Sequence, residues 1–385
     1  MKFLRLVLRS LLRSRRRTVL TVLSLGVSVF LVAILQSILG TLDSYAHNPD
    51  SANRIAVRHK VSLTNLLPLR DGDWIRQQPE VETVMALQWF GGIYQDQRNF
   101  FANFAVEPEY LAPMFREEIV RCPEAQLRDF VRDRTGCVVG RALADKFGWK
   151  LGTVVPLQGT IFPITPRLTI RAIFTGKRAS DEMALYFQYK HLEESVARMQ
   201  GKVGAFWVRA RSADDVPRLI ERIDHHFGDA LEPTLSETEN AFQLEFLKML
   251  GDYGTMIHTI TAAVLAAILI VTASTMAMTI RERATEIAVF RAMGFTGRQV
   301  LGLLMAEGVL LSGMGGLLGT ALAVAAAGAV RGNVGVSIPW LSDFQVQGAT
   351  LLFCLQATLA VGLLSTFVPA YQAIRRPIVE GLRAL

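Results

Sequence analysis

The sequence has few charged residues and few cysteines for its length. Charged residues make up 19% of its 385 residues, against about 25% in typical soluble domains. Three cysteines are too few for a disulfide-dense scaffold. The mean hydropathy of +0.30 is too high for a disordered chain. These shortages exclude small secreted scaffolds and disordered proteins.

Charge is also missing from several long apolar windows. Residues 18–40, 253–280 and 344–374 contain no charged residue, and residues 299–330 contain only Glu307. A membrane-spanning helix needs about 20 apolar residues. A cleaved signal peptide is the alternative for the first window, but its apolar core would be only about 7–15 residues long. The sequence therefore predicts an integral membrane α-helical protein with four transmembrane helices.

The basic residues explain the net charge of +7 without a nucleic-acid partner. They gather beside the apolar windows, in residues 1–17, in residues 281–298 and in the C-terminal tail, whereas the loop between the third and fourth windows has only Arg331. Lys and Arg favour the cytoplasmic side of a membrane. We therefore expect the chain to span the inner (plasma) membrane of the cell and both termini to lie in the cytoplasm. The segment between the first two spans would then be extracytoplasmic.

These windows define the predicted organisation of the chain. The predicted segments are a basic amphipathic cytoplasmic N-terminus (1–17), transmembrane helix 1 (18–41), a periplasmic domain (42–235), a stalk helix (236–254), transmembrane helix 2 (255–280), a cytoplasmic coupling turn (281–298), transmembrane helix 3 (299–330), a short periplasmic loop (331–347), transmembrane helix 4 (348–374) and a cytoplasmic tail (375–385).

The large segment between the first two spans alternates strand-like and helix-like patterns. Residues 53–59, 81–89, 168–174 and 204–210 alternate as half-buried strands do, and residues 71–78, 140–147 and 216–227 are helix-like. This mixture predicts an α/β (α+β) domain.

The three cysteines allow two arrangements. A bridge between Cys122 and Cys137 would close a loop of about 16 residues and contribute about 3 kcal/mol in the chain-entropy model. Two buried free thiols are the alternative. Cys354 lies within the fourth span and is expected to be a small apolar packing residue.

A capping-box pattern precedes the second span. Ser236 and Glu239 have the spacing that starts a helix. If this helix continued into the span it would form a stalk, with Gly251 and Gly254 as the points where it would kink.

The turn between the second and third spans predicts a short amphipathic helix. Charged and apolar residues alternate there, and Ile287, Phe290 and Met293 are expected to share one helical face. Gly294 can end the helix in a left-handed conformation, and Thr296 with Gln299 forms a second capping box. Such a helix, held between two spans, can transmit a push from a cytoplasmic partner. An ordinary solvated connector is the alternative.

The third span carries small residues and one charge. Small residues at a spacing of four allow close helix packing, and a substrate groove is the lesser option. Glu307 lies near the cytoplasmic interface and is expected to form a structural ion pair rather than a proton relay. The small residues are Gly308, Ser312, Gly315, Gly316 and Gly319.

Motifs for catalysis, metal binding and nucleotide binding are missing. His225 and His226 have no further ligand at a zinc-like spacing. No Gly-x-x-x-x-Gly-Lys-Ser/Thr stretch occurs. The sequence therefore predicts a chain that is not an enzyme and binds no cofactor itself.

Four stretches resemble one family. The first is residues 11–21, with the run Arg15-Arg16-Arg17-Thr18 before the first span, which is similar to the family's N-terminus. Residues 281–294, Arg-Glu-Arg-Ala-Thr-Glu-Ile-Ala-Val-Phe-Arg-Ala-Met-Gly, are similar to the signature of ABC-transporter permeases of the FtsX/MacB/LolC type. Residues 139–152 resemble part of the MacB-like periplasmic core domain, and residues 369–383 resemble the closing segment of the family. A MacB-type protein carries its own nucleotide-binding domain, and this chain does not.

The resemblance implies a set of partners. It implies a separate cytoplasmic ABC ATPase dimer that binds ATP and Mg, a second permease copy or a homologous permease, the lipid membrane and in some systems a periplasmic adaptor or membrane-fusion protein. The residues that would couple to the ATPase are Glu282, Arg283, Glu286, Ile287, Phe290, Arg291, Met293 and Gly294.

Three functional hypotheses follow. The first is a permease subunit that exports or extracts an envelope substrate such as a lipid, lipoprotein, peptide or drug. The second is an FtsX-like signal transmitter that activates a cell-wall hydrolase without solute transport. The third is a membrane-anchored receptor that has no ATPase. An ATPase partner would favour the first two.

Overall fold

The computed structural model describes residues 15–46, 48–97, 99, 101–249, 252–331 and 343–375. The predicted amphipathic N-terminus up to residue 14, the tail after residue 375 and most of the loop between the last two spans lie outside the described residues. The chain divides into two units. The helical unit comprises Met1–Gly40, Asp252–Ala329 and Phe344–Leu385, and the α/β unit comprises Thr41–Gly251 and Val330–Asp343.

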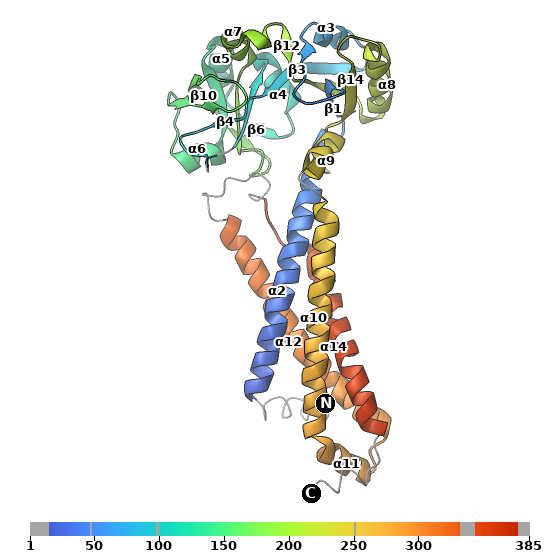
Figure 1. Ribbon diagram of the computed structural model, residues 1–385. Helices are drawn as coiled ribbons and strands as arrows, with labels where there is room; N and C mark the ends of the chain where they lie inside the picture. Colours follow the sequence, from blue (N-terminus) through green and yellow to red (C-terminus); the bar gives the residue numbers. More distant parts are fainter. Residues whose placement is uncertain are drawn as a thin grey trace. The chain divides into compact units, whose positions relative to one another are not determined.

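Long helices provide the described part of the helical unit (Figure 1). They are α2 (Arg15–Ala46), α10 (Tyr253–Glu282), α12 (Gly297–Arg331) and α14 (Gly348–Arg375). Among the described residues, four helices are long and apolar enough to cross a membrane, with mean hydropathies of 1.9 to 2.5 over windows of 18 residues. The predicted transmembrane helices are therefore confirmed.

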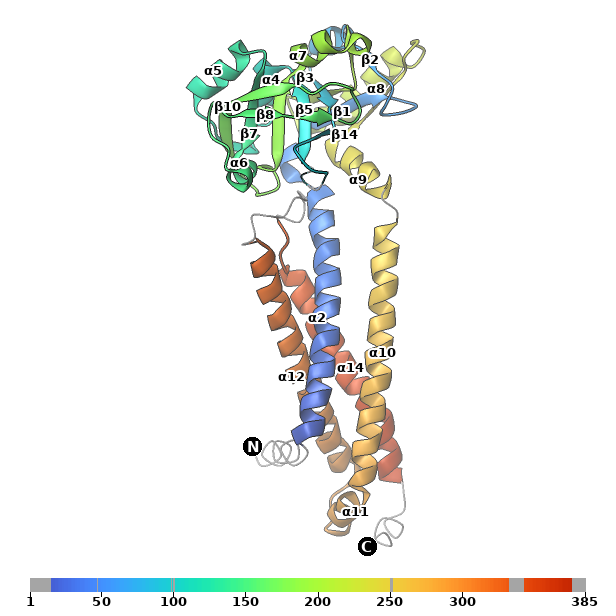
Figure 2. The ribbon, with the colours of Figure 1, turned by 60° about the vertical axis from the view of Figure 1, so that its left-hand side comes forward.

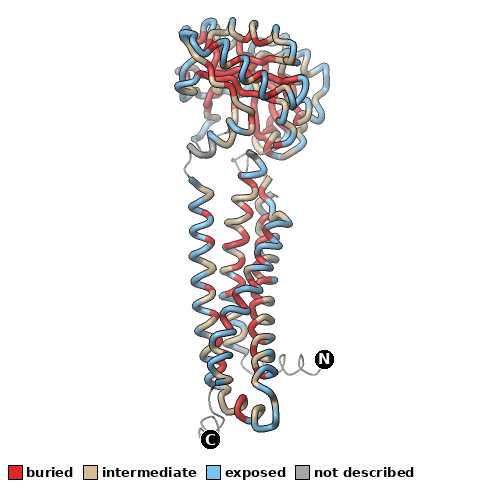
Figure 3. The backbone as a smooth tube through the Cα atoms, turned by 90° about the vertical axis from the view of Figure 1, so that its right-hand side faces the viewer, coloured by how far each residue is buried: buried red, intermediate tan, exposed pale blue. Residues whose placement is uncertain are grey.

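The long helices pack around a shared apolar core. Leu25 and Val29 of α2, Ile268 of α10, Ala323 of α12 and Cys354 of α14 are all buried in one cluster. Cys354 is a packing residue, as predicted. Along each helix, buried positions alternate with exposed ones (Figure 3), so that each presents one face to its neighbours and another to the surroundings. This pattern suits helices that lipid surrounds.

A mixed ten-stranded sheet organises the α/β unit (Figure 2). Its strands run in the order β14-β1-β13-β3-β5-β11-β7-β10-β6, and β8 pairs with β10. The pairs β10–β7 and β11–β5 are parallel, and the other pairs are antiparallel. The sheet strands are β1 (Arg54–His59), β3 (Val81–Trp89), β5 (Ala102–Val106), β6 (Ile119–Arg121), β7 (Gly136–Gly140), β8 (Val154–Pro156), β10 (Arg167–Gly176), β11 (Ala184–Gln188), β13 (Ala205–Ala210) and β14 (Thr234–Thr238).

Short helices and two small ribbons complete this unit. The strands β2 (Leu67–Pro68) and β12 (Lys202–Val203) form one ribbon, and β4 (Gly92–Ile93) and β9 (Gln158–Gly159) form the other. The helices are α3 (Asp71–Arg76), α4 (Pro108–Met114), α5 (Glu124–Arg132), α6 (Arg141–Phe147), α7 (Tyr189–Ser195), α8 (Val216–Phe227) and α9 (Glu239–Met249). The predicted α/β domain is confirmed.

Both faces of the sheet are buried. On β1, Ile55 and Val57 belong to one apolar cluster, whereas Ala56 belongs to another on the opposite face. Helices α3, α6, α7 and α8 contribute to the first cluster, and α4 and α5 contribute to the second. Every residue of β1 and β13 is therefore buried. The prediction that these two strands are half-buried is wrong, because helices cover both faces of the sheet.

The cysteines of this unit are free thiols. Cys137 on β7 belongs to the first apolar cluster, whereas Cys122 packs against the second. The predicted disulfide is wrong, because the sheet separates the two sulfur atoms. Burial raises the pKa of Cys122 to about 11, so that its thiol is protonated at neutral pH.

The predicted stalk helix begins later than expected and does not continue into the span. Ser236 lies in β14, and α9 begins at Glu239. Thr238 provides the cap instead, because its hydroxyl accepts a hydrogen bond from the backbone N–H of Ala241 at 3.2 Å. A separate cap starts α10, where the carboxylate of Asp252 accepts from the backbone N–H of Thr255 at 3.1 Å. The chain therefore forms two helices, α9 and α10, instead of one.

Candidate coupling sites

The turn between α10 and α12 contains a short helix with defined ends. This helix is α11 (Ala284–Ala292), and Arg283 separates it from α10. Gly294 follows it with a φ of 98°, a conformation that favours glycine. Thr296 and Gln299 then form the capping box of α12, in which the backbone N–H of each residue donates to the side chain of the other at 2.9 and 3.4 Å. The glycine and this capping box were both predicted.

One face of α11 packs against the ends of its neighbours. Ile287 is only 7% exposed and lies in an apolar cluster with residues of α10, α12 and α14. Phe290 packs against the same cluster and against Phe295, with 5.5 Å between the ring centroids. The neighbours in this cluster are Ile280, Val300, Leu304 and Ala370. α11 is therefore part of the helical core and not a solvated connector.

Polar contacts attach the turn to the same helices. Arg283 donates to both carboxylate oxygens of Glu307 on α12, at 3.1 and 3.0 Å. Arg291 donates to the carbonyl oxygen of Ile374 on α14 at 2.9 Å.

Arg17 of α2 forms an ion pair with Glu282 at the end of α10. Together with the contacts of Arg283 on α12 and of Arg291 on α14, this pair links the turn to all four long helices. The first turns of α2, the turn after α10 and the end of α14 therefore meet at one end of the helical unit.

Glu307 is a structural ion-pair residue, as the sequence predicted. It is 6% exposed, and its partner Arg283 holds both of its oxygens. One guanidinium nitrogen of Arg283 donates to both oxygens, which satisfies a carboxylate that would otherwise be costly to bury.

The predicted coupling residues fall into two groups. Arg283, Ile287, Phe290 and Arg291 face the helical core or its polar rim, and Glu286 is half-buried. Met293 is 62% exposed, and Gly294 and Glu282 are exposed as well. Met293 was predicted to share one helical face with Ile287 and Phe290, but α11 ends at Ala292 and Met293 follows it as an exposed residue. Val289, which is 40% exposed, lies on the open face instead.

The small residues of α12 form two packing stripes. A Cβ at Gly308 would lie 1.9 Å from the hydroxyl oxygen of Thr366, and one at Gly316 would lie 2.6 Å from Thr358, both on α14. Ser312 lies between them and is fully buried against Gly362 of α14.

The second stripe faces α2. A Cβ at Gly315 would lie 2.4 Å from the Cβ of Leu25, and one at Gly319 would lie 2.4 Å from the carbonyl oxygen of Gly26. Close packing of helices within one chain therefore accounts for all five small residues.

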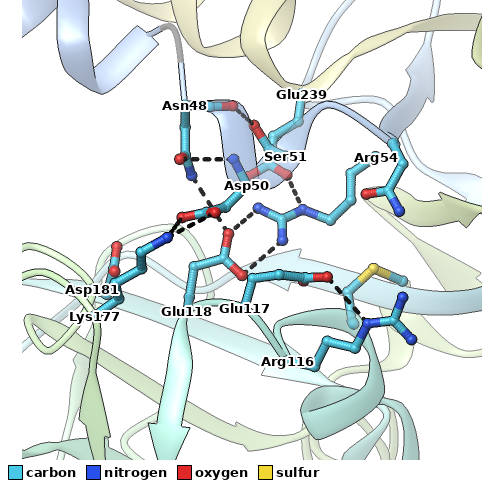
Figure 4. Close-up of polar contacts among 12 residues, drawn as sticks. Asn48, Asp50, Ser51, Arg54, Arg116, Glu117, Glu118, Lys177, Asp181 and Glu239 are labelled. Atoms are coloured by element: carbon cyan, nitrogen blue, oxygen red, sulfur yellow. Dashed lines mark hydrogen bonds and ion pairs between the residues drawn. The ribbon is translucent and has the colours of Figure 1, made fainter. Parts of the chain in front are cut away.

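A buried polar cluster lies in the α/β unit (Figure 4). Arg54 on β1 is 1% exposed and donates to both oxygens of Glu118, one of them at 2.8 Å. Its Nε also donates to Glu239, the first residue of α9. The Arg54 guanidinium lies over the ring of Phe115, with 5.2 Å to the centroid. We call Arg54, Glu118 and Glu239 the junction cluster.

In this cluster the positive charge of Arg54 lies between two carboxylates. Burial acts to lower the pKa of Arg54, but the charge of Glu239 and the hydrogen bonds and charge of Glu118 outweigh it and raise that pKa. A neighbouring pair behaves similarly. Burial acts to raise the pKa of Glu117, but hydrogen bonds from Arg209 and Arg116 lower it to about 2. Arg54 therefore remains charged inside the fold.

Sequence reasoning missed the junction cluster. An arginine within a strand such as Arg54 is the one local signal, because a buried charge requires a partner. Its partners Glu118 and Glu239 are 64 and 185 residues away along the chain. The sequence around these two glutamates contains no pattern that predicts a contact with Arg54.

The described residues contain no group of three or more His, Cys, Asp or Glu side chains that could hold a metal ion. We predicted from the sequence that His226 would be a poor metal ligand. Its ring stacks on that of Trp74, with 3.8 Å between the ring centroids.

Two family models match the chain. The MacB-like periplasmic core domain matches residues 18–226, and the FtsX-like permease C-terminal domain matches residues 259–378. A relative from Methanocaldococcus jannaschii, described as an uncharacterized ABC transporter permease, is 22% identical over 395 aligned residues, which cover 96% of this chain and 95% of the relative.

Two solved structures are similar to about half of the chain. The extracellular domain of the ABC-type transporter YknZ from Gram-positive bacteria is 15% identical, with a TM-score of 0.37, and the match covers 48% of this chain and 100% of that one. The periplasmic region of MacB from Actinobacillus actinomycetemcomitans is 12% identical, with a TM-score of 0.37, and the match covers 52% and 97%. From the two family models, the chain belongs to the ABC-transporter permeases that join a MacB-like periplasmic core domain to an FtsX-like permease domain.

Proposed function

We propose that this permease converts ATP hydrolysis by a separate cytoplasmic ATPase into a conformational change of its extracytoplasmic domain. The observation that carries the proposal is the attachment of α11. Its buried face and its charged ends contact α10, α12 and α14, and Glu282 beside it contacts α2. A force applied to α11 would therefore reach every long helix without first deforming a loop.

The exposed face of α11, together with Met293 and Gly294 that follow it, is the proposed docking surface for the ATPase. Val289 and Met293 are 40% and 62% exposed, and Ala292 and Gly294 are exposed between and beside them. Exposed apolar side chains next to charged ones are typical of protein interfaces. The charged residues Arg281, Glu282 and Arg298 are exposed around this face.

For the helical unit, we favour a role in transmitting force over a role as a passage for a solute within one chain. A cavity between α2, α10 and α14 is about 10 Å³ and is lined mainly by apolar residues, including Leu25, Ile268 and Val361. This volume is about that of a single water site. We infer that the substrate is engaged by the α/β unit, and that the chain exports or extracts an envelope component such as a lipid, lipoprotein, peptide or drug.

The proposed assembly contains further chains. ATP and Mg would bind to the ATPase dimer and not to this permease. A second permease copy, identical or homologous, would complete the membrane part, and a periplasmic adaptor would extend it in an export system. In this scheme the permease itself is not an enzyme.

Purification in mild detergent tests the proposal. We expect an ABC ATPase to co-purify with the wild-type chain and to be lost from the Met293→Asp variant, because a carboxylate would enter the docking face. The control is Leu231→Asp, since Leu231 is 96% exposed in the α/β unit and should keep the ATPase. Absence of an ATPase from the wild-type preparation, or its retention by Met293→Asp with an unchanged ATPase rate, would contradict the proposal.

A further inference from the structure

Several segments of the chain that adjoin the membrane spans meet at one edge of the sheet in the α/β unit. Asn48 follows α2, Glu239 begins the helix that precedes α10, and Asp343 precedes α14. Asn48 contacts Glu118, Glu239 is joined to Glu118 through Arg54, and Asp343 contacts the turn of residues 177–181. Glu118 and this turn flank the paired strands β6 and β10, in which Ile119 is paired with Gly176.

The segment after α2 and the start of α9 both contact the junction cluster. Arg54 joins Glu118 to Glu239, as described above, and the side chain of Asn48 donates to Glu118 at 3.5 Å. Asn240 completes the link, because its side-chain oxygen accepts from the hydroxyl of Ser51 at 2.7 Å and from the backbone N–H of Asn48 at 3.2 Å. The start of α9 is therefore fixed to the segment that leaves α2.

The segment before α14 contacts the turn of residues 177–181. The carboxylate of Asp343 accepts from the backbone N–H groups of Ala179 and Ser180, at 3.1 and 3.4 Å. In the same turn, Lys177 pairs with Asp50 at 2.7 Å, and its backbone N–H donates to the carbonyl oxygen of Glu118 at 2.9 Å. The turn is thus linked both to the segment after α2 and to the segment before α14.

We propose that the junction cluster, together with Asp343 and the turn of residues 177–181, is a joint that transmits movement of the spanning helices to the β6–β10 edge of the α/β unit. The inference rests on the proposed function. A buried ion pair adds little net stability compared with apolar residues of similar volume, but it fixes geometry through directional hydrogen bonds. Positioning, more than stability, therefore explains charges that are 1% exposed at Arg54 and 6% at Glu118 and Glu239.

The test is hydrogen exchange of the full complex, comparing the apo state with the state trapped by ATP, Mg and vanadate. The test variant is Arg54→Met/Glu118→Leu/Glu239→Leu, which removes the charges together and leaves none of the three unpaired. In the wild type we expect trapping to change exchange at α11 and at β6. In the variant we expect the change at α11 to persist and the change at β6 to be lost.

A matched control and a second variant keep the test decisive. Arg134→Met/Glu194→Leu removes an exposed pair of the same unit, with side chains 62% and 45% exposed, and should keep the β6 response. Asp343→Asn removes one charge outside the buried core and should reduce the response of the turn even if the triple variant does not fold. An unchanged β6 response in a folded triple variant, or an unchanged response of the turn in Asp343→Asn, overturns the joint. No response at α11 in the wild-type complex instead contradicts the proposed function.

Discussion

Buried arginines among the described residues contact one or two carboxylates each, and the pair of Arg283 and Glu307 tests how much each partner matters. Their side chains are 15% and 8% exposed. Replacing Glu307 by alanine leaves a largely buried guanidinium without its carboxylate, and we expect a loss of about 3–5 kcal/mol. The double variant Arg283→Met/Glu307→Met removes both charges and should recover most of this loss.

Thermal unfolding of the detergent-solubilised chain measures both variants. A double-mutant cycle gives the interaction energy between the two positions. Equal destabilisation by Glu307→Ala and by the double variant would show that the two side chains do not depend on each other.

Glu117 gives a second prediction, on the pH dependence of stability. Its pKa falls from the ordinary value of 4.5 to about 2 in the folded protein. A carboxyl group whose pKa is lowered by folding stabilises the fold fully above its unfolded pKa and loses this effect as the pH falls toward the folded pKa. The wild type should therefore exceed Glu117→Gln in stability at neutral pH, and the difference should shrink between pH 4.5 and pH 2.

The control for this pH profile is an exposed carboxylate of the same unit. Glu124 has a side chain 90% exposed and lies 3.9 Å from Arg128. Glu124→Gln should match the wild type throughout the acid range when unfolding temperature is measured against pH. A constant difference between the wild type and Glu117→Gln across that range would contradict the predicted titration.

At the scale of elements, the glycines of α12 make the packing of the helical unit testable. Gly308→Ala would place a methyl group 1.9 Å from the hydroxyl oxygen of Thr366. Overpacking of this kind typically destabilises by about 1–3 kcal/mol. Gly302 and Gly313 lie on the same helix, and a Cβ at either position would have nothing within 4 Å.

The comparison of these alanine variants isolates packing from helix propensity. Alanine favours a helix over glycine by about 1 kcal/mol, so Gly302→Ala and Gly313→Ala should be neutral or stabilising. Gly308→Ala should lower the unfolding temperature in detergent. Equal effects at all three positions would show that α12 does not approach α14 closely at Gly308.

Some elements follow from local sequence and others do not. The spans were predictable because each is a long apolar window, and β3 was predictable to the residue because its alternation covers Val81–Trp89. The stalk was misplaced because Ser236 and Glu239 have capping-box spacing although Ser236 pairs with Val57 of β1. β1 and β14 are far apart in the sequence. The residues next to Ser236 therefore give no sign that Ser236 lies in a strand rather than at the start of a helix.

At the scale of the whole molecule, the contacts that sequence reasoning missed are those between distant segments. The order of strands in the sheet places β13 between β1 and β3 and brings Arg209 close to Glu117. The same order puts Cys122 and Cys137 on opposite faces of the sheet, although only 14 residues separate them in the sequence. Turn chemistry is local, which is why Gly294 and Thr296 were found. The junction cluster is not local, and its residues could be identified only once the strands were ordered.

The arrangement of the chain across the membrane yields the last prediction. The basic ends of α2, α10 and α14 meet at one end of the helical unit, and clusters of Lys and Arg remain on the cytoplasmic side. Cysteines at Leu231 and Met293, which are 96% and 62% exposed, should therefore be labelled from opposite sides. In a Cys122→Ser background, an impermeant maleimide added to intact cells or spheroplasts should label Leu231→Cys at once and Met293→Cys only after permeabilisation. Labelling of both without permeabilisation, with a cytoplasmic control protein still protected, would place α11 outside the cell and contradict its proposed contact with an ATPase.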